Sequence, residues 1–303
     1  MPAPRLRAST WAFAALLVMT AAWGSTFFMI KDVVTRIPVA DLLAVRFGIA
    51  AAALALVAGK HLRMSRTTLR RGIALGLLYG VAQILQTFGL AHTAASVAGF
   101  ITGLYVVATP LLSAAILRVA IARSTWVAVG LATIGLGVLS LNGFSVGYGE
   151  LLTFASAIIY AGHIIAMGRL STAATAMSLT LVQMLVITAM CTVAALPGGI
   201  QVPGSGRDWV IVIYLAVVAG ALAMFLQTWA QAHIEASRAA VIMAMEPVWA
   251  AAFAVALGGE LITVRMVIGG VAILGAMYLV ELAPPVRTSS DTANASPLTT
   301  LKR

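Results

Sequence analysis

Long apolar runs constrain this chain more than any other feature. Ten runs of about 20 mostly apolar residues follow one another along the sequence. About 20 apolar residues is the length of α-helix that crosses the hydrocarbon core of a bilayer. We therefore predict an all-α membrane protein with ten transmembrane helices. The ten predicted spans are residues 11–30, 40–58, 72–91, 94–117, 124–142, 150–168, 176–196, 209–232, 237–258 and 263–281.

The composition agrees with a lipid environment. Apolar residues make up 61% of the chain and charged residues only 9%, whereas a soluble domain has about 25% charged residues. The net charge of +10 does not indicate a nucleic-acid partner, because the basic residues lie in short loops, where they orient the protein in the bilayer. The single cysteine, Cys191, excludes an intrachain disulfide and a cysteine-based metal centre, so no metal or other cofactor is expected.

Residues flanking the apolar runs predict the orientation of the chain. Arg5 and Arg7 before the first run would suit a signal peptide, but the run is long for one and further spans follow, so we interpret it as a retained helix. With the N-terminus in the cytoplasm, fourteen of the 19 Lys and Arg residues lie on the cytoplasmic side. This bias predicts that both termini are cytoplasmic. The tail 284–303 is polar and rich in Ser and Thr, and is predicted to be a disordered cytoplasmic tail.

The sequence also repeats itself. The segment Gln86–His92 recurs as Gln227–His233, 141 positions later, with Gln-Thr at the start and Ala-His at the end of both copies. Each of the helices that follow contains one proline, Pro110 and then Pro247. Chance similarity between apolar helices is the alternative, but it does not explain why the matches occur in the same order. The chain is therefore divided into a first half, 1–142, and a second half, 148–283, with five helices each.

An odd number of helices in each half has a topological consequence. The second half must enter the membrane from the opposite side, which makes an inverted repeat. Many secondary transporters have this plan, with the substrate bound near the midplane between the halves. Thr26 and His163 are 137 positions apart, as are Pro110 and Pro247. We therefore expect segments 23–27 and 160–164 to be related by a two-fold axis in the membrane plane and to border one cavity.

Several motifs resemble a known family. They are Trp23-Gly24-Ser25-Thr26-Phe27, Arg46 within Leu42-Leu43-Ala44-Val45-Arg46-Phe47, the fourth-helix pattern Gly99–Leu104 with Pro110, and Glu246-Pro247-Val248 followed by Gly259-Glu260. Over about residues 11–283 the chain resembles the EamA-type, ten-helix members of the drug/metabolite transporter superfamily. One position departs from the pattern. Many members have an acidic residue after helix four, matching Glu260 in the second half, where this chain has Arg123.

The resemblance implies a function and a location. The most similar subgroup is the bacterial exporters of amino acids and related metabolites, so a multi-pass protein of the bacterial inner membrane is expected. The cargo would cross by alternating access, with helices one to four and six to nine around a central cavity. Relatives in the superfamily carry nucleotide sugars, triose phosphates and quaternary ammonium drugs. A multidrug exporter of hydrophobic cations is therefore the alternative.

Glu246 is the candidate for binding or coupling. It lies about nine residues, or about 14 Å, into the ninth predicted span, where a carboxylate is costly unless it faces protein or water. It either binds a substrate amine or carries a coupled proton, which would make proton coupling part of transport. The structural alternative is that it bonds backbone groups freed by Pro247.

Two other polar residues within spans have alternative roles. Arg46 could attract a substrate carboxylate, but we favour a structural role in which it extends toward the outer surface and pairs with Asp41 or Asp32. His163 could relay a proton, but a hydrogen-bonded polar wall residue is the favoured interpretation.

Tyr79, Gln83 and Gln86 form one polar stripe at helical spacing, which must line a cavity or a helix contact because lipid would penalise it. The residues predicted to line a substrate cavity are Trp23, Thr26, Phe27, Tyr79, Gln83, Tyr105, Tyr160, His163, Trp229 and Glu246. Structural roles are expected for Arg46, Pro110 and Pro247. The glycines Gly130, Gly135, Gly269 and Gly275 are expected to allow close helix packing.

Enzymatic patterns are missing from the sequence. It has no GxSxG elbow, no Walker-type loop ending in Lys and no His or carboxylate set at metal-ligand spacing. An intramembrane enzyme or an interaction protein is the rival from another class, and it would need a nucleophile or metal set that the sequence does not contain. We predict a transporter that is not an enzyme and whose partners are a small-molecule substrate and membrane lipid.

Overall fold

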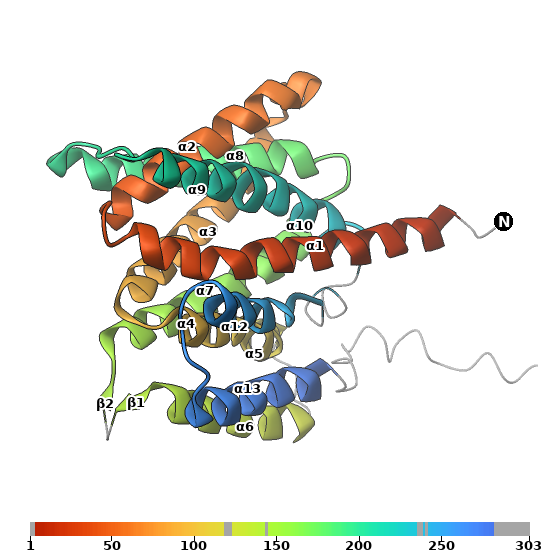
Figure 1. The fold of residues 1–303 in the computed structure, drawn as a ribbon. Coiled ribbons are helices and arrows are strands. Elements are labelled where there is room, and N and C mark those ends of the chain that lie inside the picture. The colour runs from red at the N-terminus through yellow and green to blue at the C-terminus, as the bar shows by residue number, and fades with distance from the viewer. Residues whose placement is uncertain (1–3, 118–122, 143–144, 235–238, 240–241, 282–303) are drawn as a thin grey trace, which may run out of the picture.

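The computed structural model describes residues 4–117, 123–142, 145–234, 239 and 242–281. Apart from one short hairpin, its described elements are helices (Figure 1). The first half contains α1 (Pro4–Val33), α2 (Val39–Ala58), the short 3-10 helix η1 (Gly59–Leu62), α3 (Arg66–His92), α4 (Ala95–Gly103), α5 (Tyr105–Leu117) and α6 (Arg123–Ser140). The antiparallel strands β1 (Leu141–Asn142) and β2 (Ser145–Val146) connect it to the second half. The second half contains α7 (Tyr148–Leu170), α8 (Ala176–Ala195), η2 (Leu196–Gly198), α9 (Gly206–Ala216), the π-helix η3 (Val217–Leu222), α10 (Ala223–Gln231), α12 (Glu246–Ala256) and α13 (Val264–Glu281).

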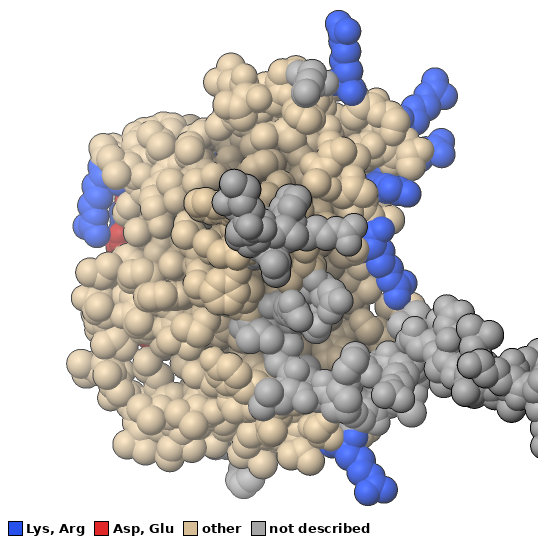
Figure 2. Space-filling view, turned by 90° about the vertical axis from the view of Figure 1, so that its right-hand side faces the viewer, with Lys and Arg blue, Asp and Glu red and all other residues tan. Residues whose placement is uncertain are grey.

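The helices are suited to a membrane. Seven described segments are long and apolar enough to cross a bilayer, and three further apolar helices of 10–17 residues are shorter. Large apolar side chains such as Leu56, Leu261 and Val271 are exposed on the outside, where lipid would cover them. In Figure 2, Lys and Arg side chains gather along one edge, and a smaller group lies with acidic atoms at the opposite edge. On the face shown, the described surface between the two edges carries few of these charges, which suits a protein that spans a membrane.

The start of α3 and the continuity of the fourth predicted span differ from the sequence prediction. The polar residues 66–71 belong to α3, because the Ser65 hydroxyl accepts the N–H of Thr68 at 3.1 Å and caps the helix. The fourth predicted span is interrupted at Leu104, between α4 and α5. Pro110 lies inside α5, where its ring and missing N–H weaken the preceding turn.

The ninth predicted span is also interrupted, so the prediction of Glu246 well inside one continuous helix is wrong. Turn residues 244–245 precede α12, and Glu246 is the first residue of that helix. Pro247 is the second residue, a position where proline is tolerated because its N–H would be unbonded. The proline therefore begins a helix rather than bending one.

The two halves pack with one another in a reciprocal pattern. The second, fourth and fifth helices of each half meet their counterparts, as α2 with α8, α4 with α12 and α6 with α13. The third helix of one half meets the first of the other in both directions, as α3 with α7 and α10 with α1. Equivalent residues also make equivalent bonds. His92 and His233 each bond through Nδ1 to a carbonyl one turn earlier in their own helix, at 2.8 Å in both cases.

The direction of three helices follows from contacts at their ends. Lys31, near the end of α1, donates to the carbonyl oxygens of Leu90 and Ala91 near the end of α3, at 3.1 and 2.9 Å. Gly89 of α3 lies against Gly149 at the start of α7, so closely that a Cβ on either residue would meet the other backbone. Helix α7 therefore begins at the end of the bundle where α1 and α3 finish.

The glycine prediction is confirmed in part. Gly135 of α6 and Gly269 of α13 face each other across the contact at the lower end of Figure 1, where a Cβ on Gly135 would lie 2.8 Å from the Gly269 carbonyl oxygen. A Cβ on Gly275 would lie 3.3 Å from Leu131, which is a tight but lesser contact. Gly130 has open space around it, so its predicted role in packing is wrong. The tail 284–303 lies outside the described residues.

Candidate functional site

A cavity lies between the two halves, with an empty volume of about 540 Å³ when the space open to solvent is included. Its wall comes from α1 to α5 in the first half, and from α7, η3, α10 and α12 in the second. Neither α6 nor α13 contributes a lining residue. The lining residues are Trp23, Thr26, Phe27, Arg46, Tyr79, Gln83, Gln86, Thr102, Tyr105, Tyr160, His163, Ile164, Ala219, Gln227, Met243 and Glu246.

The structure brings together nine of the ten residues predicted to line a cavity. The exception is Trp229, whose ring packs on His233 with centroids 4.4 Å apart, away from the cavity. Sequence analysis did not place Gln227 there, although the repeat pairs it with Gln86 of the polar stripe. Ile164 belongs to the segment 160–164 that was expected to border the cavity, whereas the lining residues Thr102, Ala219 and Met243 were not predicted.

A network of tyrosine and amide groups forms one wall. The Tyr160 hydroxyl from α7 lies 2.5 Å from Oε1 of Gln83 and 3.0 Å from Oε1 of Gln86, both on α3. A hydroxyl has one proton, so Tyr160 donates to the two amide oxygens in turn. The Gln86 amide in turn donates to the Thr102 hydroxyl at 3.1 Å. The polar stripe of α3 therefore lines the cavity in a fixed orientation.

Two residues that each follow a helix interruption meet at the centre of the site. Tyr105 is the first residue of α5 and Glu246 the first of α12. The Tyr105 hydroxyl lies 3.1 Å from Glu246 Oε2 and 3.1 Å from the carbonyl oxygen of Met243. Glu246 is only 4% exposed, so this hydroxyl is important for its solvation. The other carboxylate oxygen is available to a cargo or a proton.

Arg46 does not make the predicted pair with Asp41 or Asp32. Asp32 pairs with Arg36 and Arg207, and Asp41 accepts the backbone N–H of Gln201 at 3.1 Å. The Arg46 side chain lines the cavity instead, with its guanidinium carbon 4.4 Å from the centre of the Phe47 ring. It is 5% exposed, and its Nε and Nη1 atoms have no hydrogen-bond partner.

His163 is bonded to the layer behind the cavity. Its Nε2 lies 2.7 Å from Oε1 of Gln183 on α8, which lines no part of the cavity itself. An amide oxygen only accepts, so Nε2 carries the proton and the ring is held as a donor. Its ring also packs on Tyr79, with centroids 5.4 Å apart. The geometry is that of a polar wall residue.

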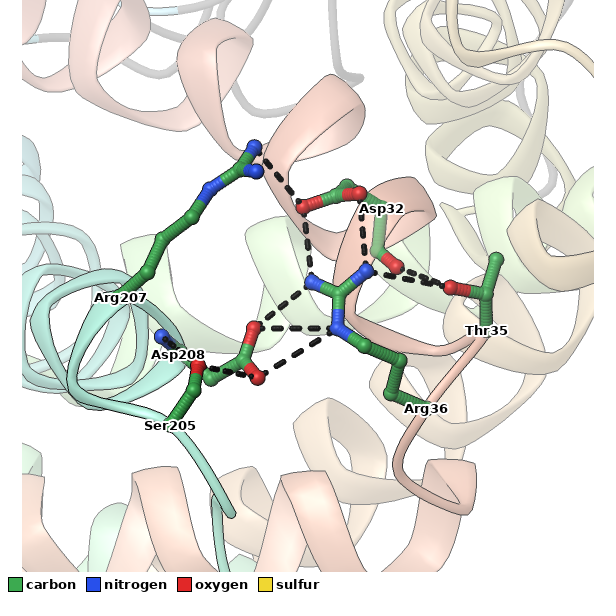
Figure 3. Close-up of polar contacts among 6 residues, drawn as sticks. All are labelled: Asp32, Thr35, Arg36, Ser205, Arg207 and Asp208. Carbon is green, nitrogen blue, oxygen red and sulfur yellow. Dashed lines mark hydrogen bonds and ion pairs between the residues drawn. The ribbon is translucent and has the colours of Figure 1, made fainter.

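Charged groups gather at the end of the bundle where α1 finishes, and Figure 3 shows Arg36 between two carboxylates. Arg36 bonds Asp32 at 2.8 Å and Asp208, near the start of α9, at 2.7 Å. Ser205 donates to Asp208 at 2.8 Å, and Arg207 reaches Asp32 at 3.4 Å. The hydrogen bonds from Arg36 to Asp32 and Asp208 raise the pKa of its guanidinium above the ordinary value, so the network stays charged and ties α1 to α9.

Glu260 has a role at the same end of the bundle. From the loop before α13, its carboxylate accepts the backbone N–H of Ala95 at 2.6 Å and bonds the Ser96 hydroxyl. It therefore caps α4 at the helix end that favours negative charge. Arg123 holds the equivalent place in the first half and has no carboxylate for such a cap. The matching residues 236 and 237 lie outside the described part of the chain.

Comparisons with known proteins agree with this architecture. The model of the EamA-like transporter family matches residues 10–141 and again 147–282. An uncharacterized transporter from Archaeoglobus fulgidus is 28% identical over 269 residues, which cover 88% of this chain and 84% of that protein. A solved crystal structure covers 90% of this chain and 96% of its own, with a TM-score of 0.63 and 20% sequence identity. That last likeness concerns the fold alone.

Proposed function

Because the chain belongs to the EamA-like transporter family of the drug/metabolite transporter superfamily, we propose that it is a secondary transporter that exports small metabolites, with amino acids as the favoured cargo. The observation that carries this proposal is the cavity between the halves, which combines a buried carboxylate with neutral hydroxyl and amide groups. A cargo with an ammonium group would bind Glu246, and the tyrosines and amides would bind its other polar groups. As a transporter, the protein would have no enzymatic activity.

The proposed mechanism is alternating access by two inverted halves, residues 1–142 and 148–283. The reciprocal packing of the helices supports a two-fold relation between the halves. The start of α7 lies beside the end of α3, at the end of the bundle where α1 also finishes. The first helices of the two halves therefore run in opposite directions, which is the arrangement of an inverted repeat. The segments 23–27 and 160–164, at equivalent places in α1 and α7, each supply lining residues.

The proposed location is the bacterial inner membrane, with both termini in the cytoplasm. The exposed arginines Arg66, Arg70 and Arg71 of α3 and Arg169 of α7 support this orientation. They lie at one end of the bundle, where Leu75 of α3 packs on Met167 of α7. The mixed group of Arg36, Asp32 and Asp208 lies at the other end.

The direct test is transport by the purified protein in liposomes. Vesicles would be loaded with a labelled mixture of the common amino acids, or with labelled tetraphenylphosphonium as a hydrophobic cation. Release of amino acids above that of protein-free vesicles is the expected result. Release of the cation alone would favour the multidrug alternative, which Glu246 and the aromatic residues of the cavity support. If neither probe moves, the proposed amino-acid transport is wrong.

A further inference from the structure

Among the described residues that line the cavity, Arg46 is a charged side chain with no polar partner. Arg46 is only 5% exposed, and yet its buried Nε and Nη1 atoms have no hydrogen-bond partner. Buried polar groups nearly always have a partner, and a buried charge is costly without one. An arginine that served only the fold would bond a carboxylate or backbone carbonyls. The missing partner therefore points to a ligand that binds Arg46 in the cavity.

The orientation of Arg46 indicates what that ligand is. The guanidinium lies over the Phe47 ring, 4.4 Å from its centre. The contact with the ring uses none of the N–H donors, and Nε and Nη1 have no hydrogen-bond partner. The spacing of these donors matches two oxygens of one carboxylate or phosphate. The ring therefore holds the guanidinium in place for an oxyanion.

The charges that line the cavity favour a carboxylate over a phosphate as the group that binds Arg46. Its lining contains one arginine and one glutamate, and these two residues form no ion pair with each other. Tyr79 and Tyr160 line the same cavity as both. A phosphate monoester brings nearly two negative charges against one positive group, with Glu246 also in the cavity. A zwitterion brings one charge of each sign and leaves both protein groups paired.

We propose that Arg46 binds the carboxylate of the cargo while Glu246 binds its ammonium group, so that the transported molecules are zwitterionic amino acids. This proposal rests on the proposed transport function and defines its substrate class. It makes Arg46 the residue that distinguishes an amino acid from the amine that lacks the carboxylate. Hydrophobic cations are rejected for the same reason, because they would leave Arg46 buried and unpaired.

Matched pairs of cargo test the proposal. Wild-type protein in liposomes would be given L-phenylalanine with phenethylamine, and L-leucine with isoamylamine, each pair differing only in the carboxylate. The amino acid mixture, tetraphenylphosphonium and inorganic phosphate complete the panel. The wild-type protein is expected to prefer the amino acid. Arg46→Gln is expected to reduce that preference by about 10- to 100-fold, the ratio that corresponds to a lost charge-assisted hydrogen bond. Arg46→Lys keeps the positive charge and is expected to retain part of the preference for the amino acid.

Thermal stability distinguishes a ligand-binding role of Arg46 from a structural one. If Arg46 stabilised the fold, its replacement would lower the midpoint of unfolding. Arg46→Met removes an unpaired buried charge, so the midpoint of unfolding without cargo is expected to rise above that of the wild type. Stabilisation of the wild type by the amino acid mixture is expected to disappear in this variant. Arg169→Gln, at an exposed position outside the cavity, is the control and should behave as wild type in both assays.

The outcomes separate this proposal from the transport function. If amino acids are transported and Arg46→Gln keeps the wild-type preference, the role of Arg46 is wrong and the function stands. Transport of phosphate, amines or tetraphenylphosphonium in place of amino acids overturns the zwitterionic cargo but leaves a transporter. If nothing moves, the transport function fails, and stabilisation by amino acids that depends on Arg46 would still establish the carboxylate site. If there is neither transport nor stabilisation by amino acids that depends on Arg46, both proposals are wrong.

Discussion

Tyr105 and Glu246 are joined by a hydrogen bond of 3.1 Å, and they stand 141 positions apart in the sequence. This is also the spacing between the repeated segments that begin at Gln86 and Gln227. The two positions are nevertheless not equivalent in the repeat, because Pro110 and Pro247 are 137 positions apart and pair Glu246 with Thr109. What Tyr105 and Glu246 share is that each is the first residue of a helix that follows an interruption. One half supplies a phenol there and the other a carboxylate.

Glu246→Gln is expected to change transport more than folding. The glutamine amide keeps the shape of the side chain and can still accept from Tyr105, so the stability cost is limited to about 1–3 kcal/mol. Transport measured in liposomes over a range of pH should become slow and should lose its pH dependence. A variant with wild-type transport and pH dependence would leave Glu246 with a structural role only.

Tyr105→Phe removes the hydroxyl that bonds Glu246 and the Met243 carbonyl. Loss of a hydrogen bond to a charged group is expected to cost about 1.5–3 kcal/mol, and the pH profile of transport should change with it. Tyr214→Phe is the matched control, because Tyr214 bonds Ser25 at 2.8 Å outside the cavity. Equal effects of the two variants on the pH profile would argue against a functional role for Tyr105.

Gly135→Leu is expected to destabilise the contact between α6 and α13. A side chain there meets the Gly269 backbone and Ile273, and overpacking of this kind costs about 1–3 kcal/mol. Gly130→Leu, on the same helix but with open space around it, should leave the unfolding midpoint near that of the wild type. Equal loss of stability in the two variants would show that leucine itself, and not the contact, is responsible.

Labelling from outside the cell tests the orientation. Cys191 is buried, and Cys191→Ser provides a background without thiols. In that background, Arg207→Cys, at a side chain that is 78% exposed, should react with a membrane-impermeant maleimide in intact cells. Arg169→Cys, at the opposite end of the bundle, should react only after the cells are opened. The reverse pattern would place the termini outside.

The ion pairs of Figure 3 are expected to differ in strength. Asp208 is only 7% exposed where it meets Arg36, whereas Arg207 is 78% exposed where it meets Asp32. A double-mutant cycle on Arg36 and Asp208 should give a coupling of about 1 kcal/mol, and one on Arg207 and Asp32 a coupling near zero. High salt should weaken the first coupling only partly. Equal couplings would mean that burial has no influence here.

The sequence predicted the spans and most of the cavity for a clear physical reason. Polar side chains at helical spacing within an apolar run must face protein or water, so Tyr79 and Gln83 could be assigned to a cavity before the fold was known. Trp229 could not be placed in this way. Helix α10 follows the π-helix η3, where wider turns change which face points inward, and it is Gln227 that lines the cavity.

The pairing predicted for Arg46 was wrong for a reason that the helix geometry explains. Asp41 precedes Arg46 by five residues in α2, whereas side chains meet along a helix at spacings of three or four. Asp32 lies one turn before Arg36 in the sequence, and that nearer arginine takes it. The packing that leaves Arg46 beside the cavity without a partner depends on helices from both halves, which the local sequence does not describe.

The cap that Glu260 provides for α4 has a consequence for how the two halves depend on each other. The group that completes a helix of the first half belongs to the second half, just as Arg36 of the first half neutralises Asp208 of the second. Each half therefore supplies a charged group that the other uses, and separating the halves would leave α4 without its cap and Asp208 without Arg36. The exchange is not symmetric, because Arg123 stands in the first half at the position that corresponds to Glu260 and cannot accept backbone N–H groups.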